Sequence, residues 1–302
     1  MIKFISIFIE KLKTIHSKLG KPLTQIKGHL NIFERKFYFF IYKIKRSNLD
    51  DLKIDINLKY NEICNELRNQ GIVKLENCIP KSSIFKIKKF LDESLLKGEN
   101  LSPNSSDINK TPYISVIQPQ LHETEILEIA LSDLIIGISK CYLEAKPSLT
   151  GFNLRKSFVN DAPQWETQFY HSDRNSIKFL KFFIYLNDVD ENGGPFVYIK
   201  TSHRKKFWGW LIKYRWNDDE IEMRYPNQKV LCTGKIGDMF IADTTGFHKG
   251  LKPSQNERSM LTINVSIHPD FMDAKQAFTL EKIKAQHISD NKKFFIDFLK
   301  IV

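Results

Sequence analysis

Residues 169–196 read FYHSDRNSIKFLKFFIYLNDVDENGGPF, a histidine and an aspartate followed by an apolar run and an acidic, glycine-rich turn. His171 and Asp173 are two positions apart, so on a strand their side chains leave the same face, about 7 Å apart at the backbone, and can share one metal ion. Residues 179–186 predict a buried strand, and residues 192–195 predict a turn. The segment therefore predicts a metal-binding site in a fold rich in β-strands.

The pattern H-x-D occurs twice in the chain, the second time at His268 and Asp270. Only the first pair is followed by a strand, a turn and a further histidine, His248, in the segment DTTGFH. We therefore interpret His268 as a structural residue at the end of a strand. We interpret His203 in the same way, as a turn residue near the mouth of a barrel.

Two histidines and one carboxylate on one side of a metal ion form the facial triad of non-haem iron(II) oxygenases, and His171, Asp173 and His248 supply that set. The triad leaves positions open for a bidentate 2-oxo acid and for dioxygen. The far carboxylate of such an acid requires a cation, which an arginine offers in a planar fork. Arg258 fits this role because it lies on the mostly polar face of the strand predicted at 258–267, with Met260, Thr262, Asn264 and Ser266.

Several short segments occur in a fixed order along the chain: residues 71–77, 169–173, 181–196, 201–204, 237–238, 245–250 and Arg258. In residue type and order they resemble the phytanoyl-CoA dioxygenase-like branch of the iron(II)/2-oxoglutarate-dependent oxygenases. The resemblance extends over roughly residues 57–268. It is much more specific than an H-x-D pair alone.

The resemblance implies a double-stranded β-helix that binds iron(II) and 2-oxoglutarate and uses dioxygen. It implies that His171, Asp173 and His248 bind the iron and that Arg258 anchors 2-oxoglutarate. Phe183 matches a position that often lines the cosubstrate pocket. Lys181 shares the strand face of Phe183 and is expected to point into the same pocket, with solvent at the barrel rim as the alternative.

This chain differs from the family pattern in two places. Residues 200–203 read Lys-Thr-Ser-His where the family usually has Pro-Gly-Ser-His, and Gly250 stands where relatives commonly carry a hydroxyl side chain. The second contact to 2-oxoglutarate is therefore left open. The presence of Asp173 favours hydroxylation, or another oxidative hydrogen abstraction, over halogenation, because related halogenases replace this carboxylate with a small residue.

The predicted fold class is α+β with a mainly β core. Helices are expected at residues 57–70, 80–96 and 124–145, and strands at 72–75, 149–158, 168–171, 179–186, 196–200, 239–242 and 258–267. A mostly helical first half followed by many strands indicates a jelly-roll or cupin-like barrel supported by helices. The predicted domains are a helical basic extension at 1–56 and the oxygenase-like domain at 57–302.

Positive charge is concentrated in the N-terminal extension. The whole chain of 302 residues has a net charge of +11, and residues 1–50 contain eleven lysines and arginines against three acidic residues. The rest is nearly neutral, so nucleic-acid binding is not expected. The basic, amphipathic residues 1–46 suggest either a solvated helix, packing on the barrel, or peripheral contact with a membrane.

Four cysteines without a C-x-x-C pair predict a reducing compartment, and no apolar run reaches the roughly 18 residues of a membrane span. The expected location is the cytoplasm, with the inner face of a membrane as a second possibility. The expected substrate is a small molecule or a lipid- or sugar-linked one, and the sequence leaves the oligomeric state open. Two alternatives remain: another cupin-like metalloenzyme, for example a hydrolytic one, and a non-catalytic membrane-associated binding module.

Overall fold

The computed structural model describes residues 58–102, 111–144, 147–161, 163–173, 178–210, 213–267, 279–296 and 299–301. The chain divides into two compact units, of which the second comprises residues 52–206 with 215–302. The second unit contains every helix and strand named below. The predicted extension at 1–56, the proposed membrane contact of 1–46 and His268 lie outside the described residues and stay predictions.

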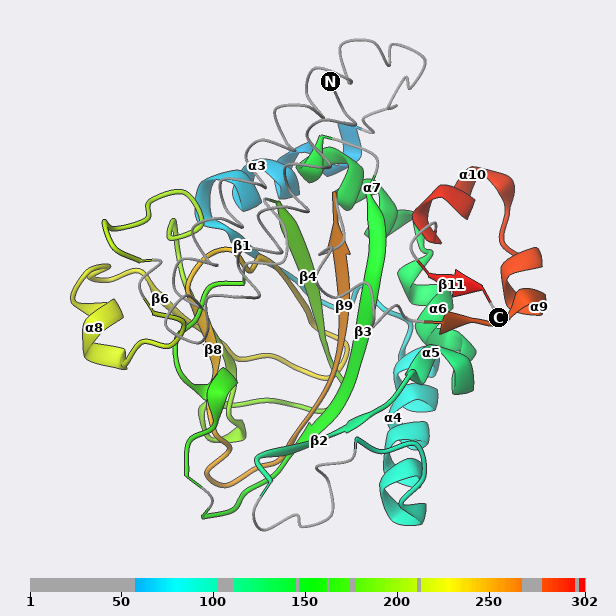
Figure 1. Cartoon of the computed structure of the whole chain (residues 1–302), viewed down its shortest axis with the longest axis horizontal. Coiled ribbons are helices and arrows are strands. Elements are labelled where there is room, and N and C mark those ends of the chain that lie inside the picture. Colours follow the sequence, from blue (N-terminus) through cyan, green and yellow to red (C-terminus); the bar gives the residue numbers. More distant parts are fainter. Residues whose placement is uncertain are drawn as a thin grey trace, which may run out of the picture. The chain divides into compact units, whose positions relative to one another are not determined.

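The second unit is mainly helical up to residue 143 and mainly strands from residue 148 to residue 266, and short helices follow near its end (Figure 1). Its helices are η2 (Leu58–Tyr60), α3 (Asn61–Gln70), α4 (Lys81–Lys97), α5 (Pro119–His122), α6 (Thr124–Ala130), α7 (Asp133–Leu143), η3 (Glu166–Gln168), η4 (Glu191–Gly193), α8 (Asp218–Glu222), α9 (Lys282–Gln286), α10 (Asp290–Lys293) and η6 (Phe294–Ile296). Its strands are β1 (Ile72–Leu75), β2 (Tyr113–Val116), β3 (Ser148–Ser157), β4 (Phe179–Tyr185), β5 (Phe196–Ile199), β6 (Lys229–Cys232), β7 (Met239–Asp243), β8 (His248–Gly250), β9 (Arg258–Ser266), β10 (Thr279–Leu280) and β11 (Lys300–Ile301).

Two antiparallel sheets build the core of this unit. The larger has the strand order β1-β7-β4-β9-β3-β2, and the smaller has the order β6-β5-β8. One cluster of buried side chains contains residues of both sheets, among them Phe183 and Met260 of the larger sheet and Phe196 and Tyr198 of the smaller. The two sheets therefore pack face to face, as a double-stranded β-helix requires.

The outer face of the larger sheet is covered by helices. Phe182 and Ile184 on β4, and Leu261 and Ile263 on β9, point to this face and are fully buried. Helices α4 and α5 contact β3, and α3 contacts β1 and β7 (Figure 1). Because β4 is buried on both faces, its sequence is almost continuously apolar instead of alternating.

Some expected elements differ from the observed ones. The helix expected at 124–145 is two helices, because Ser132 starts α7 by accepting a hydrogen bond from the amide of Ile135. The strand expected at 168–171 consists of the end of η3 and two isolated bridges, at Tyr170 and His171. Strands β2, β6 and β8 were not predicted; β8 is only three residues long.

All four cysteines are free thiols, as the sequence led us to expect. Among the described helices, none combines the length and the apolar character that crossing a bilayer requires.

Candidate metal centre

The backbone brings three distant side chains to one place. His171 and His248 form an antiparallel bridge in which each amide donates to the other's carbonyl, both at 2.9 Å. Two residues further on, the amide of Asp173 donates to the carbonyl of Thr244 at 2.8 Å. The segment that carries His171 and Asp173 is therefore joined directly to the segment that leads into β8.

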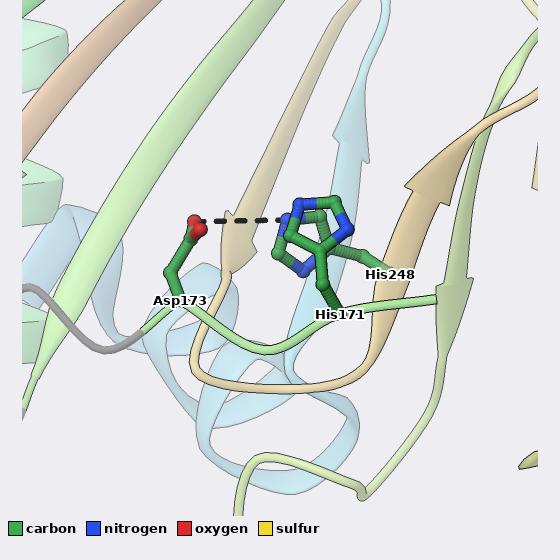
Figure 2. Close-up of side chains that lie close together, drawn as sticks. All are labelled: His171, Asp173 and His248. Carbon is green, nitrogen blue, oxygen red and sulfur yellow. Dashed lines mark ion pairs between the residues drawn. The ribbon is translucent and has the colours of Figure 1, made fainter. Parts of the chain in front are cut away.

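The side chains of His171, Asp173 and His248 converge, and their candidate ligand atoms all lie within 4.8 Å of one another (Figure 2). The imidazole centroids of the two histidines are 4.2 Å apart, and Nε2 of His248 is 3.6 Å from Oδ2 of Asp173. The three residues predicted to form a triad are thus assembled in one cluster.

Hydrogen bonds fix the orientation of both imidazoles. Nδ1 of His171 lies 2.9 Å from the carbonyl of Phe169, and Nδ1 of His248 lies 2.9 Å from the carbonyl of Gly246. A carbonyl oxygen only accepts, so each Nδ1 carries the proton and each Nε2 presents a lone pair. This is the arrangement that metal-binding histidines commonly have.

Burial keeps the two imidazoles neutral. It lowers the pKa of His171 to about 4, against an opposing effect of the Asp173 charge. Burial, with the neighbouring His171, also holds the pKa of His248 well below its ordinary value. Both rings are therefore in the neutral form that a metal ion needs as a ligand.

Asp173 is held as a carboxylate. Burial alone would raise its pKa, but the charge of Lys181 holds the pKa of Asp173 below its ordinary range. Lys181 Nζ lies 2.8 Å from Oδ2 of Asp173, yet this buried oxygen accepts no well-directed hydrogen bond. Two neutral nitrogen donors and one under-coordinated carboxylate oxygen fit a divalent metal ion of the first transition row.

Arg258 lies at the start of β9 and is buried. Its guanidinium donates to the carbonyl of Gly194, Nη2 lies 3.4 Å from Oγ of Ser157, and Nε is buried without a partner. Burial lowers its pKa to about 10, so it remains a cation at neutral pH. A buried cation with a free donor and no carboxylate partner among the described residues is suited to bind an anion.

The structure accounts for the glycine at position 250. A Cβ atom added to Gly250 would lie 3.2 Å from Nη2 of Arg258, so a larger side chain would press on the guanidinium. The hydroxyl near this guanidinium comes from Ser157 on β3, directly opposite Arg258 in the sheet. The sequence alone did not point to Ser157.

Lys181 and Phe183 point to the inner face of the larger sheet. The ring of Phe183 stacks on Phe196 with centroids 4.2 Å apart, and Phe196 lies 5.6 Å from the ring of His248. Lys181 turns to Asp173 and is 21% exposed, so it is not a solvated residue at the barrel rim. His203 is outside this cluster; its Nε2 bonds to the carbonyl of Arg68 at 3.1 Å.

A second hydrogen-bond network supports the loop that leads to His248. The buried hydroxyl of Tyr142 donates to Oδ2 of Asp243 at 2.5 Å, and Oδ1 of Asp243 accepts from the amide of Thr245 at 3.0 Å. The hydroxyl of Tyr198 donates to the carbonyl of Asp243 at 2.8 Å. Asp243, at the start of residues 243–248, is therefore fixed by two tyrosines and itself binds the amide of Thr245.

Comparisons with known proteins agree on the fold. No protein-family model matches the chain, and no curated protein matches it in sequence. Among solved structures, EctD from S. alaskensis with bound Fe has 14% sequence identity and a TM-score of 0.56, covering 68% of this chain and 75% of that one. The non-heme alpha ketoglutarate dependent carbocyclase SnoK from nogalamycin biosynthesis has 16% identity and a TM-score of 0.54, covering 71% of this chain and 88% of that one.

The epimerase SnoN, solved with Fe3+, alpha ketoglutarate and nogalamycin RO, has 14% identity and a TM-score of 0.53, covering 68% of this chain and 82% of that one. Identities this low establish the fold only. The predicted fold class is therefore confirmed: the chain has the double-stranded β-helix of iron/2-oxoglutarate enzymes, with a His-Asp-His cluster inside it.

Proposed function

We propose that this chain is a non-haem iron(II)/2-oxoglutarate-dependent dioxygenase that hydroxylates an unactivated C–H bond of a small-molecule substrate, or of a lipid- or sugar-linked one. The observation that supports it most is the convergence of His171, Asp173 and His248 in the same fold interior as the buried Arg258. Solved enzymes with this fold include ones with iron or 2-oxoglutarate bound.

In this proposal Nε2 of His171, Nε2 of His248 and a carboxylate oxygen of Asp173 would hold the iron. When bound, iron(II) and 2-oxoglutarate supply the dioxygen-dependent oxidation, in which the 2-oxo acid becomes succinate and carbon dioxide. The Nδ1–H bonds of the two imidazoles hold the rings in place before the metal arrives.

Arg258 is the proposed anchor for the far carboxylate of 2-oxoglutarate. Its guanidinium has an unused donor, and the hydroxyl of Ser157 is close enough to join the same carboxylate. Phe183 supplies an apolar wall beside the cosubstrate and helps to keep water away from it. Lys181, which pairs with Asp173, would offer a second cation to the cosubstrate.

The buried arginine also weighs against the two alternatives. A hydrolytic metal site needs a general base beside the metal and has no use for Arg258. A non-catalytic barrel has no need for a carboxylate beside two neutral imidazoles and a buried guanidinium without a carboxylate partner among the described residues, because buried charges are costly without a ligand.

The test is an oxygen-free titration of the full chain with iron(II) and 2-oxoglutarate, followed by exposure to oxygen. We expect a visible charge-transfer band, then succinate formation that candidate substrates stimulate. The variant Asp173→Asn should lose the charge-transfer band and succinate formation. Asp188 is an exposed carboxylate paired with Lys235, and the variant Asp188→Asn should keep the band and succinate formation. The absence of iron binding together with the absence of any succinate would contradict the proposal.

The basic N-terminal segment is proposed to contact a membrane surface. Eleven lysines and arginines in residues 1–50 would be attracted to acidic lipid head groups. Sedimentation with acidic vesicles should retain the full chain more strongly than a chain lacking residues 1–56. Equal retention of the two would remove this idea and would leave the proposed chemistry untouched.

A further inference from the structure

We propose that the substrate of this site carries an anionic oxygen group, a carboxylate or a phosphate, and that Arg155 binds it. The inference rests on the proposed function and specifies its substrate class. It concerns the inner face of the larger sheet beyond the metal cluster, where β9, β3 and β2 lie side by side.

Arg155 points into the space between the two sheets. It lies directly opposite Met260, which belongs to the buried cluster shared by both sheets, and opposite Ser115 on its other side. Its neighbour Lys156 points the other way and forms an ion pair with Glu257 at 2.8 Å. The two adjacent cations therefore occupy opposite faces of β3, one internal and one external.

The guanidinium of Arg155 has no counter-charge. Its Cζ lies 5.0 Å from the centroid of the Tyr113 ring, and its Nε is buried without a hydrogen-bond partner. None of the described carboxylates forms an ion pair with it. Burial lowers the pKa of Arg155, against the opposing effect of the nearby Tyr113 hydroxyl, which carries no charge at neutral pH. Such a cation is costly to hold unless a ligand supplies the missing charge.

Further polar atoms without partners lie on the same face. Oγ of Ser115, Oδ1 of Asn153 and Oδ1 of Asn264 are all buried and unpaired. By strand register, Asn264 lies opposite Lys181 and Ser115 lies opposite Arg155. These side chains extend from the neighbourhood of the metal cluster to the edge strand β2, so they form a lining suited to a polar molecule.

The inner face of β3 is partly exposed, although the polar atoms named above are buried. On β3 the inward-facing Asn153 and Arg155 are partly exposed, whereas the outward-facing Phe152 and Leu154 are buried under the helices. In a filled core, the inward-facing residues would be the more buried ones. The space beside Arg155 is therefore accessible to a ligand.

The balance of charge in this interior indicates the sign of the ligand's charge. The described residues of this interior include three cations, Arg155, Lys181 and Arg258, and one carboxylate, Asp173. A ferrous ion adds two positive charges and 2-oxoglutarate removes two, so the loaded site keeps an excess of two. Arg258 is assigned to the cosubstrate, and the nearby charge of Arg155 contributes to lowering the pKa of Arg258. A substrate anion at Arg155 would reduce the excess.

The experiment uses the full chain without oxygen, loaded with iron(II) and saturating 2-oxoglutarate, with the charge-transfer band as proof of loading. Propionate and inorganic phosphate are the anionic probes, and propionamide is the neutral match of propionate. We expect at least one anion to raise the melting temperature and to perturb the band, while propionamide does neither. The anion that raises the melting temperature and perturbs the band shows whether the substrate carries a carboxylate or a phosphate.

Three variants locate the effect. Arg155→Gln should weaken binding of the active anion by about tenfold or more, the loss expected from one charge-assisted hydrogen bond, and Arg155→Lys should weaken it less. Lys156→Gln removes the same charge from the outer face and should leave binding unchanged. If the band forms but neither anion binds, or propionamide binds equally well, the inference is wrong and the proposed function stands. If no band forms, both fail.

Discussion

Lys181 Nζ lies 2.8 Å from Oδ2 of Asp173, so in the absence of a metal ion the ammonium group neutralises the carboxylate of the candidate metal centre. Both side chains are mostly buried, 21% and 16% exposed, which makes their interaction stronger than that of a surface pair. A metal ion that binds Asp173 must therefore replace an internal cation.

Replacing this lysine should separate protein stability from metal affinity. Lys181→Met leaves Asp173 without its cation, so the metal-free protein should lose up to about 3 kcal/mol of unfolding free energy. The affinity for iron(II) or manganese(II) should rise about tenfold to hundredfold, because no ammonium repels the ion. Urea unfolding with and without metal measures both the unfolding free energy and the metal affinity. Lys89→Met, on the exposed side of α4, is the control. Metal affinity that stays equal or falls would count against this reading of Lys181.

The two contacts proposed for the far carboxylate of 2-oxoglutarate should differ in strength. Arg258→Gln should raise the concentration needed for half-saturation about 100-fold or more, since a charged, forked donor is lost. Ser157→Ala should cost less than about tenfold, the loss of one neutral hydrogen bond. The charge-transfer band measures both without oxygen. Arg204→Gln, an exposed arginine that donates to the carbonyl of Asn69, should have no effect. A larger loss for Ser157→Ala than for Arg258→Gln would reverse the assignment.

Tyr142 should affect metal binding without touching the metal. Tyr142→Phe removes the 2.5 Å hydrogen bond to Asp243 but keeps the buried ring. We expect a loss of about 1.5–3 kcal/mol in unfolding free energy and about a tenfold loss in iron(II) affinity, because Asp243 and the next residues position His248 and Asp173. Tyr225→Phe, which removes a 2.6 Å bond to the carbonyl of Lys205, should lower stability only. Metal affinity that is unchanged in Tyr142→Phe would show that the network is purely structural.

The sequence alone predicted those features that depend on residues close together in the chain or on a recognisable order of motifs. His171 and Asp173 are neighbours on one segment, His248 followed from the resemblance, and all three lie in one cluster. The role of Arg258, which the resemblance also implied, stays a prediction. The apolar run of β4 and the alternation along β9 likewise predicted strands at the observed places. Short strands were not predicted, because a three-residue strand such as β8 is too short to show a hydrophobic period.

The remaining site residues depend on register and on packing between distant segments. Ser157 meets Arg258 only because β3 pairs with β9 across 101 positions, in a register shifted by an irregularity between Leu149 and Gly151. Tyr142 meets Asp243 because α7 packs near the end of β7, again 101 positions away. No local pattern records either pairing, because both follow from tertiary structure.

His203 should make the stability of the protein depend on pH. Its Nε2–H donates to the carbonyl of Arg68 at 3.1 Å, and its Nδ1 is buried with no partner, so a proton added there would have no acceptor. Burial, with the charges of Arg204 and Lys206, lowers the pKa of His203 below the ordinary 6.5, against the opposing effect of Asp243. Below pH 6.5 the unfolded chain therefore binds a proton that the folded chain refuses, and the folded state loses stability as pH falls.

His203→Gln keeps a side-chain donor but cannot titrate. The unfolding free energy of the natural chain minus that of this variant should be largest near pH 7.5 and should decrease towards pH 5.5. Urea unfolding at several pH values, with a chelator present, measures the difference, and the other histidines cancel because both proteins contain them. His287→Gln, at an exposed position, should show no such trend. Parallel pH curves for the natural chain and His203→Gln would mean that His203 takes up its proton equally in both states.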